Sequence, residues 1–153
     1  MNLAKMLKKE NIFIADTYED TDSFYADYSG FLKQRGIINN KEAIKRLFVK
    51  RENVQSTAIG KGAAAPHIFS DKFPQFIFSM ALIKNGLDFK APDNGNVYLV
   101  FLLMSDERDV GMHLKSLAHI GRLVRCTDIV ADTKKTGNAD EVYNILLEKE
   151  KTI

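Results

Sequence analysis

Cysteine and histidine are scarce in this chain of 153 residues, which contains one cysteine and three histidines. A single cysteine, Cys126, excludes an internal disulfide. The three histidines, His67, His113 and His119, show no zinc-ligand spacing among themselves or with that cysteine. We therefore expect no structural metal and no bound cofactor.

An excess of charge of either sign is also missing. Lysine and arginine together number 22 against 20 aspartate and glutamate residues, which gives a formal net charge of +2. This excess is far too small to form the basic face that binding a nucleic-acid backbone requires. Nucleic acid is therefore excluded as an expected partner.

Long hydrophobic runs are missing as well. The longest, such as Val97–Met104, have the length of a buried strand and fall well short of the roughly 20 apolar residues of a membrane span. The first residues, Met1–Lys9, are typical of a short amphipathic helix and lack the apolar segment and cleavage site of a secretory signal. We therefore expect a cytoplasmic protein with no direct membrane insertion.

Two helical patterns open the chain. From Asp22 onward, apolar residues recur at three- and four-residue steps until Gly36, whose freedom to adopt a left-handed conformation can end a helix. Asn39, followed three residues later by a glutamate, has the spacing of a capping box. This spacing predicts a second helix that ends near Lys50 or Arg51.

Strand patterns follow, and two more helices close the chain. Ser56–Pro66 is a run of small residues with two glycines, typical of a turn that leads into a buried, close-packed strand. Phe76–Ile83 and Val97–Met104 are rich in β-branched and aromatic residues and predict the central strands of a sheet. We expect a helix over about Val110–Arg125 and a last one that begins at Asn138.

These patterns predict one domain over residues 1–153, since 45% of the chain is hydrophobic and its length suits a single core. Its class is α/β (α+β layered), with a mixed central β-sheet flanked by helices. Cys126, near the end of the expected helix 110–125, fits a small buried thiol with no catalytic role. That helix is expected to present one broad apolar face, formed by His113, Leu114, Leu117, Ala118, Ile120, Gly121 and Val124.

His67 is the first candidate for chemistry. It follows the small-residue strand and Pro66, which removes a backbone donor and biases Ala65 toward an extended conformation. The imidazole would then leave a strand end at a defined angle, with small neighbours that leave room for a partner to approach. An ordinary loop histidine fits the position equally well.

Two further residues, His113 and Arg51, have both a functional and a structural interpretation, and His119 has only a structural one. His113 lies in the first turn of an expected helix, where a neutral imidazole could donate to a nearby anion, and it also fits a half-buried histidine on an apolar face. Arg51, at an expected helix end, fits either a solvated cation near the negative end of the helix dipole or a bidentate phosphate ligand. His119 falls on another face of its helix than His113 and is expected at the surface.

These candidates belong to one longer pattern. The pattern resembles the enzyme IIA domain of the bacterial phosphoenolpyruvate-dependent sugar phosphotransferase system, fructose/mannitol class (type 2, including the nitrogen-related IIA proteins), over nearly the whole chain. Its specific part is the run Thr-x-Ile-Gly-x-Gly-x-x-x-Pro-His with a His-Leu downstream. In order, the matching residues are Arg51-Glu52, Ser56-Thr57-Ala58-Ile59-Gly60-Lys61-Gly62-Ala63-Ala64-Ala65-Pro66-His67, Gly86-Leu87-Asp88-Phe89, and His113-Leu114 with Leu117 and Leu123.

The resemblance implies a phosphoryl carrier. In that family the histidine after the proline accepts the phosphoryl group, which assigns this role to His67, and His113 and Arg51 would flank it. The donor implied is the histidine phosphocarrier protein, and the acceptor is a cysteine of a IIB component. Two residues depart from the family pattern, namely Ala58, where glycine is usual, and Ala64, where a bulkier aliphatic is usual.

Three functions are consistent with the sequence. The first is a component of sugar uptake that passes the phosphoryl group to IIB, and we favour it here. The second is a regulatory module, similar to the nitrogen-related IIA proteins, whose phosphorylation state selects its protein partners. The third is an adaptor without phosphoryl chemistry. The sequence lacks both a phosphate-binding Gly-x-x-x-x-Gly-Lys-[Ser/Thr] loop and a kinase signature, so ATP is not expected as a substrate.

Overall fold

A mixed β-sheet of six strands forms the centre of the computed structural model, which describes residues 1–153. The longest strands, β5 (Ile77–Leu87) and β6 (Val97–Ser105), pair in antiparallel orientation. The strand order is β1-β5-β6-β3-β2, and β4 also pairs with β6. The shorter strands are β1 (Ile12–Ala15), β2 (Ala58–Gly60), β3 (Ala63–Ala64) and β4 (His67–Phe69).

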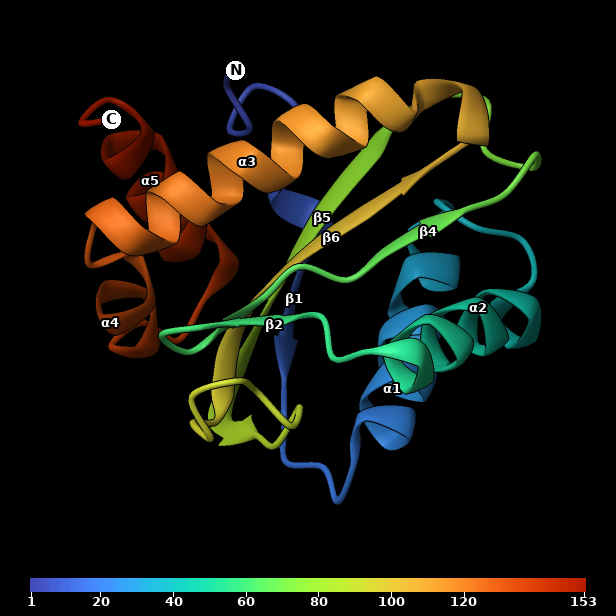
Figure 1. The fold of residues 1–153 in the computed structure, drawn as a ribbon, viewed down its shortest axis with the longest axis horizontal. Coiled ribbons are helices and arrows are strands. Elements are labelled where there is room, and N and C mark those ends of the chain that lie inside the picture. The colour runs from blue at the N-terminus through green and yellow to red at the C-terminus, as the bar shows by residue number, and fades with distance from the viewer.

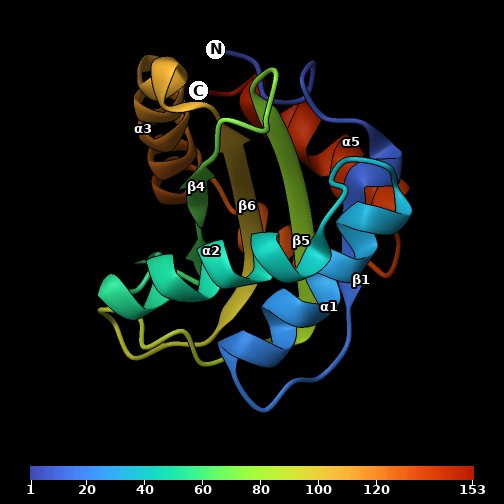
Figure 2. The ribbon, with the colours of Figure 1, turned by 90° about the vertical axis from the view of Figure 1, so that its right-hand side faces the viewer.

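Helices cover both faces of the sheet (Figure 1). On one face lie α1 (Thr21–Gln34) and α2 (Lys41–Val54). On the other lie α3 (Val110–Cys126), α4 (Ile129–Lys134) and α5 (Ala139–Glu150). Figure 2, turned by 90°, shows α1 and α2 in front of the strands. The expected class, a mixed central sheet flanked by helices in one domain, is confirmed, and none of the helices has the length and hydropathy of a membrane span.

The two helical layers bury both faces of the central strands. Successive residues of β6 from Leu99 to Met104 alternate between the core under α1 and α2 and the core under α3 to α5, and all six are fully buried. A strand covered on both faces has no solvent-facing side, so its sequence is a continuous apolar run. The predicted strands Phe76–Ile83 and Val97–Met104 are confirmed as β5 and β6, and their burial on both faces explains the apolar runs that identified them.

The first residues differ from the prediction. Residues 1–8 form a turn, followed by the 3-10 helix Lys9–Asn11 and then β1, so the expected amphipathic helix is wrong and β1 was missed. The reason is a long-range contact, because the backbone N–H groups of Leu3 and Ala4 donate to the Glu150 carboxylate at 2.8 and 2.7 Å. This contact fixes the turn from the other end of the chain.

The predicted end of α1 holds, but both ends of α2 differ from the prediction. α1 ends at Gln34, and Gly36 two residues later has a φ of 76°, as predicted for the turn that ends this helix. α2, however, is capped by Asn40 instead of Asn39, since its side chain accepts from the Ala43 N–H at 3.0 Å. α2 also continues to Val54, so Arg51 lies about one turn before its end.

The apolar face of α3 is narrower than the sequence suggested. Its buried residues are His113, Ser116, Ile120, Leu123 and Val124, which lie along one side of the helix. Leu114, expected on this face, is 63% exposed because it lies about 100° around the helix from His113. α5 begins as predicted, with the Asn138 side chain accepting from the N–H of Glu141 at 2.9 Å.

The turn before the candidate histidine uses both of its glycines. Gly60 and Gly62 have φ angles of 86° and 82°, and Lys61 between them has 55°, so the backbone reverses in the left-handed region between β2 and β3. The Lys61 N–H donates to the Asp93 carboxylate at 2.9 Å. A Cβ atom on Gly62 would lie 2.9 Å from Cγ1 of Val130.

We therefore expect Gly62→Ala to lower the free energy of unfolding by roughly 1–3 kcal/mol, because it combines a strained φ with a steric clash. The matched control is Gly30→Ala in α1, where an added Cβ meets nothing within 4 Å. This control should raise the free energy of unfolding by about 0.5–1 kcal/mol. Urea unfolding of both variants gives the comparison, and equal stability of the two would contradict this account of the turn.

Candidate functional site

His67 is the first residue of β4 and is paired in register with Leu103 of β6. Its Nδ1 lies 3.0 Å from the backbone oxygen of Ala65. A carbonyl oxygen only accepts hydrogen bonds, so this contact places the proton on Nδ1 of the neutral ring. The lone pair is then on Nε2, and the side chain is half-buried. The geometry thus leaves one defined nitrogen available as a nucleophile.

Small residues precede His67, but they do not form an open approach. Ala63, Ala64 and Ala65 are at most 3% exposed. They pack within the sheet, where β3 lies beside β6 and the Ala65 N–H donates to the backbone oxygen of Thr57 at 3.0 Å. The expectation that these residues leave room for a partner is wrong. Their small size instead allows close packing behind the site.

His113 lies next to His67, as the resemblance implied. The centroids of the two rings are 6.1 Å apart, with an interplanar angle of 68°. His113 is 1% exposed, and its ring packs at 4.3 Å against Phe69 and edge-on at 5.5 Å against Phe76. The imidazole is therefore held by an aromatic pocket from β4 and the segment before β5.

Burial changes the electrostatics of this pair. Burial, together with a smaller effect of the neighbouring His67, lowers the pKa of His113 from 6.5 to about 4. His113 is therefore neutral near pH 7. Its Nε2 lies 2.6 Å from Oγ of Ser105, whereas its buried Nδ1 has no hydrogen-bond partner. One ring nitrogen of His113 is thus unpaired in the free protein.

Arg51 lies in α2, which packs against β4. Its Nη1 donates to the backbone oxygen of Gln55 at 2.7 Å, which is the usual contact of an arginine near a helix end. It makes no hydrogen bond to either histidine. The structure therefore brings His67 and His113 into one site and places Arg51 on an adjoining helix, with most of its guanidinium donors unused.

Glu52 was not predicted as part of the site framework. Its carboxylate accepts from the hydroxyl of Tyr25 at 2.5 Å and from the N–H and the hydroxyl of Thr57 at 2.6 and 2.7 Å. These bonds connect α1, the end of α2 and the segment that leads into β2. Burial and the nearby Glu52 carboxylate raise the pKa of Tyr25. Glu52 is part of the matching family pattern, but the sequence assigns it no role, because an acidic residue beside Arg51 looks like part of a solvated helix end.

Two other residues are corrected by the structure. His119 is only 14% exposed instead of lying at the surface, and its Nε2 lies 2.6 Å from the Glu150 carboxylate that also holds the first turn of the chain. It has no contact with the histidine pair. Cys126 is exposed instead of buried, because it lies beside Arg125 on the solvent side of the last turn of α3.

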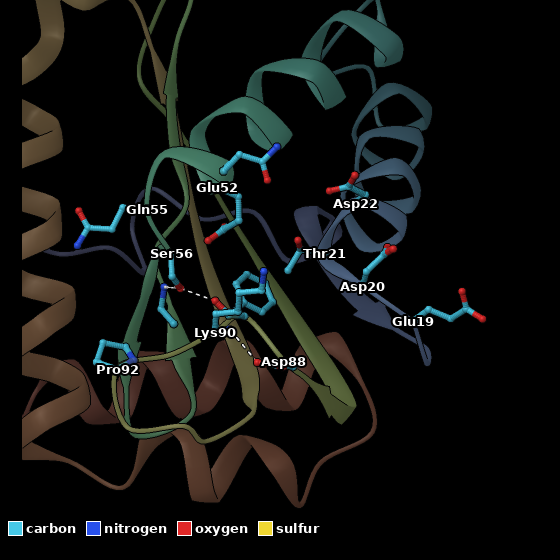
Figure 3. A pocket seen from close by; sticks show the side chains of 13 residues that line it. Glu19, Asp20, Thr21, Asp22, Glu52, Gln55, Ser56, Asp88, Lys90 and Pro92 are labelled. Atoms are coloured by element: carbon cyan, nitrogen blue, oxygen red, sulfur yellow. Dashed lines mark hydrogen bonds between the residues drawn. The ribbon is translucent and has the colours of Figure 1, made fainter.

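A cavity of about 650 Å³ lies elsewhere, between the first turn of α1, the end of α2 and the loop after β5 (Figure 3). Acidic side chains predominate among the labelled residues, including Glu19, Asp20, Asp22 and Asp88. Neither histidine lines it. Carboxylates repel phosphoryl oxygens, so this cavity is unsuited to hold a phosphoryl group.

Comparison with known proteins adds to this geometry. The family model described as phosphoenolpyruvate-dependent sugar phosphotransferase system, EIIA 2, matches residues 5–149. This chain belongs to that family. A nitrogen regulatory protein of Bradyrhizobium diazoefficiens is 35% identical to this IIA chain over 107 residues, which cover 70% of each protein.

Solved structures show the same fold. The nitrogen regulatory protein IIA-Ntr from Neisseria meningitidis has a TM-score of 0.82 at 23% identity, over 94% of this chain and 98% of that one. A chain from the complex of mannitol enzyme IIA with phosphorylated enzyme IIB of Escherichia coli has a TM-score of 0.75 at 16% identity, over 93% and 97%. The type-2 IIA architecture is therefore retained at low identity.

The two departures from the family pattern are accommodated in this IIA chain. Ala58 is not among the residues with positive φ, so a side chain there causes no backbone strain. Ala64 is fully buried in β3 and pairs with Val100 of β6. Both alanines thus fit the sheet that carries His67.

The lowered pKa of His113 predicts a pH dependence of stability. Between about pH 4 and pH 6.5 the unfolded chain binds more protons than the folded one, so stability falls as the pH drops through this window. His113→Gln removes the group, and its loss of stability across the window should be smaller than that of the wild type. Urea unfolding at pH 7 and pH 4.5 measures both, and an identical loss in the two proteins would contradict the assignment.

Proposed function

We propose that this protein is a phosphoryl carrier and that Nε2 of His67 is the acceptor. The observation that carries the proposal is the bond between Nδ1 of His67 and the Ala65 oxygen, which leaves the Nε2 lone pair free on a half-buried ring. The lone pair attacks the phosphorus of a phosphohistidine on the histidine phosphocarrier protein. The donor N–P bond breaks, its electron pair returns to the donor imidazole, and an N–P bond forms on His67.

Onward transfer follows the same chemistry in reverse. A cysteine thiolate of a IIB component attacks the phosphorus on His67, and the electron pair of the broken N–P bond returns to Nε2. The loose transition state of phosphoryl transfer needs positioning and charge stabilisation more than a strong base. In this scheme the Arg51 guanidinium offsets the charge of the phosphoryl oxygens, and His113 donates a hydrogen bond to them. No metal or nucleotide takes part.

A regulatory role is the second candidate, in which the phosphorylation state of His67 selects protein partners without sugar uptake. It is favoured by two named relatives, the nitrogen regulatory proteins of Bradyrhizobium diazoefficiens and Neisseria meningitidis. The complex of mannitol enzyme IIA with phosphorylated IIB supports the transport role instead. Adding fructose- and mannitol-type IIB proteins to the phosphorylated chain separates the two, since only a transport component passes its phosphoryl group on.

The assignment of His67 as acceptor is tested by phosphorylating the protein with its proposed donor proteins. We expect the wild-type protein, incubated with phosphoenolpyruvate, enzyme I and the histidine phosphocarrier protein, to gain one phosphoryl group by intact mass. That group should be lost in mild acid and survive alkali, as an N–P bond does. His67→Ala should gain none, because it lacks the nucleophile.

His119→Gln is the control for this labelling, because His119 contacts Glu150 and lies outside the site. It should gain the phosphoryl group as the wild type does. Peptide mapping that places the group on Ser56, Thr57 or His113 would overturn the assignment. So would a well-folded His67→Ala protein that still accepts it.

Arg51→Ala should fold normally and slow phosphoryl transfer on the order of 100-fold, because it removes one preorganised charge from the phosphoryl site. Lys50→Ala is the matched control, since Lys50 is an exposed cation in the same turn of α2. Stopped-flow or quench-flow transfer rates in both directions give the comparison. A wild-type rate in Arg51→Ala would show that Arg51 takes no part in phosphoryl transfer and serves only its contact with Gln55.

A further inference from the structure

Ser105 is buried at the last position of β6, opposite Phe69 of β4. Its Oγ makes two contacts, one of 2.6 Å with Nε2 of His113 and one of 3.0 Å in which it donates to the backbone oxygen of Asp106. Figure 2 shows that the end of β6 leads into α3 beside β4. Asp106, directly after the strand, and His113 on the helix are therefore both within hydrogen-bond distance of the Ser105 hydroxyl.

These two contacts define the proton positions in the free protein. A hydroxyl has one proton, and the Asp106 carbonyl can only accept. Both bonds are satisfied at once only if Ser105 donates to Asp106 and accepts from an N–H at Nε2 of His113. His113 is then the Nε2–H tautomer, and its unpartnered Nδ1 carries a lone pair.

That tautomer does not suit a phosphorylated neighbour. A phosphoryl group on His67 brings several acceptor oxygens toward His113, whose ring centroid is 6.1 Å from that of His67. An Nδ1 lone pair cannot donate to them, whereas an N–H can. Turning the ring over would move Nε2 away from Ser105 and break that bond. Moving the proton is the simpler change.

We propose that Ser105 is a positioning residue that lets His113 change tautomer when His67 is phosphorylated. This rests on the proposed function. In the phosphorylated protein the Ser105 hydroxyl rotates away from the Asp106 oxygen and donates to Nε2. His113 releases its Nε2 proton to water and takes one from water at Nδ1, so it stays neutral and the net charge is unchanged. The new Nδ1–H donates to a phosphoryl oxygen.

Serine is suited to this role because a hydroxyl both donates and accepts. An alanine at 105 would do neither, and a backbone amide or carbonyl in its place would fix one tautomer permanently. Ser105 acts through His113 and does not touch the reacting atoms itself. Its effect should therefore be visible in the protonation of the ring as well as in the rate.

The first experiment observes the tautomer directly in the full-length protein. Long-range ¹H–¹⁵N correlation spectra should show the free wild type with Nε2 protonated and Nδ1 unprotonated in His113. After phosphorylation by the donor proteins, the assignment should be reversed. An unchanged tautomer, or protonation of both nitrogens, would overturn the switch while leaving phosphorylation of His67 intact.

The second experiment removes the hydroxyl. In Ser105→Ala we expect the free protein to lose its single His113 tautomer and transfer to slow by roughly 10- to 100-fold, the size of effect seen when a metal-binding imidazole loses its hydrogen-bond partner. Ser116→Ala is the matched control, because Ser116 is equally buried one turn after His113 and its hydroxyl has no partner. This variant should keep the wild-type tautomer and rate.

The outcomes separate the switch from the proposed function. If the wild type takes no phosphoryl group from the donor, the proposed function fails and the switch fails with it. If the wild type is phosphorylated but Ser105→Ala matches Ser116→Ala in tautomer and rate, only the role of Ser105 is wrong. Should Ser105→Ala not fold, the spectra of the wild type in its two states still decide the question.

Discussion

Strand β6 hydrogen-bonds to three other strands and is buried on both faces, and the candidate site depends on these contacts. Pairing with β3 fixes the turn that precedes His67, and pairing with β4 fixes His67 itself opposite Leu103. The end of β6 then supplies Ser105 and leads into α3, which returns His113 to the same edge. A sheet core that is closely packed on both sides is rigid, so it can hold two imidazoles at a fixed distance.

The same burial that fixes His113 also determines its charge. Burial favours the neutral form of the His113 imidazole, a second imidazole nearby adds to this preference, and the carboxylate of Asp109 opposes it more weakly. A neutral ring can donate one hydrogen bond without repelling a cationic neighbour. Under the proposed function, positive charge for the phosphoryl group would come from outside the pair, and the Arg51 guanidinium on α2 is the candidate source.

Much of the fold could be predicted from local sequence, because several elements are determined by their own residues. The central strands are apolar on both faces, and α1 and α5 carry clear end signals in Gly36 and Asn138. The first turn of the chain could not be predicted, since its geometry depends on Glu150, 147 residues from Leu3. Leu114 was misplaced for a related reason, because only packing decides how wide the buried face of a helix is.

The candidate site also contains residues that the sequence identified and residues that only the structure revealed. His67 and His113 were candidates from their positions in the chain, and the family pattern favoured their functional interpretation. Their proximity then follows from the pairing of β4 with β6. Ser105 was missed, and Glu52 was in the family pattern without a role, because each acts through a hydrogen bond that only the folded chain forms. A carboxylate or a hydroxyl is common on any surface, and only its burial beside a particular partner gives it a role. The residues that position a nucleophile are therefore harder to predict from sequence than the nucleophile itself.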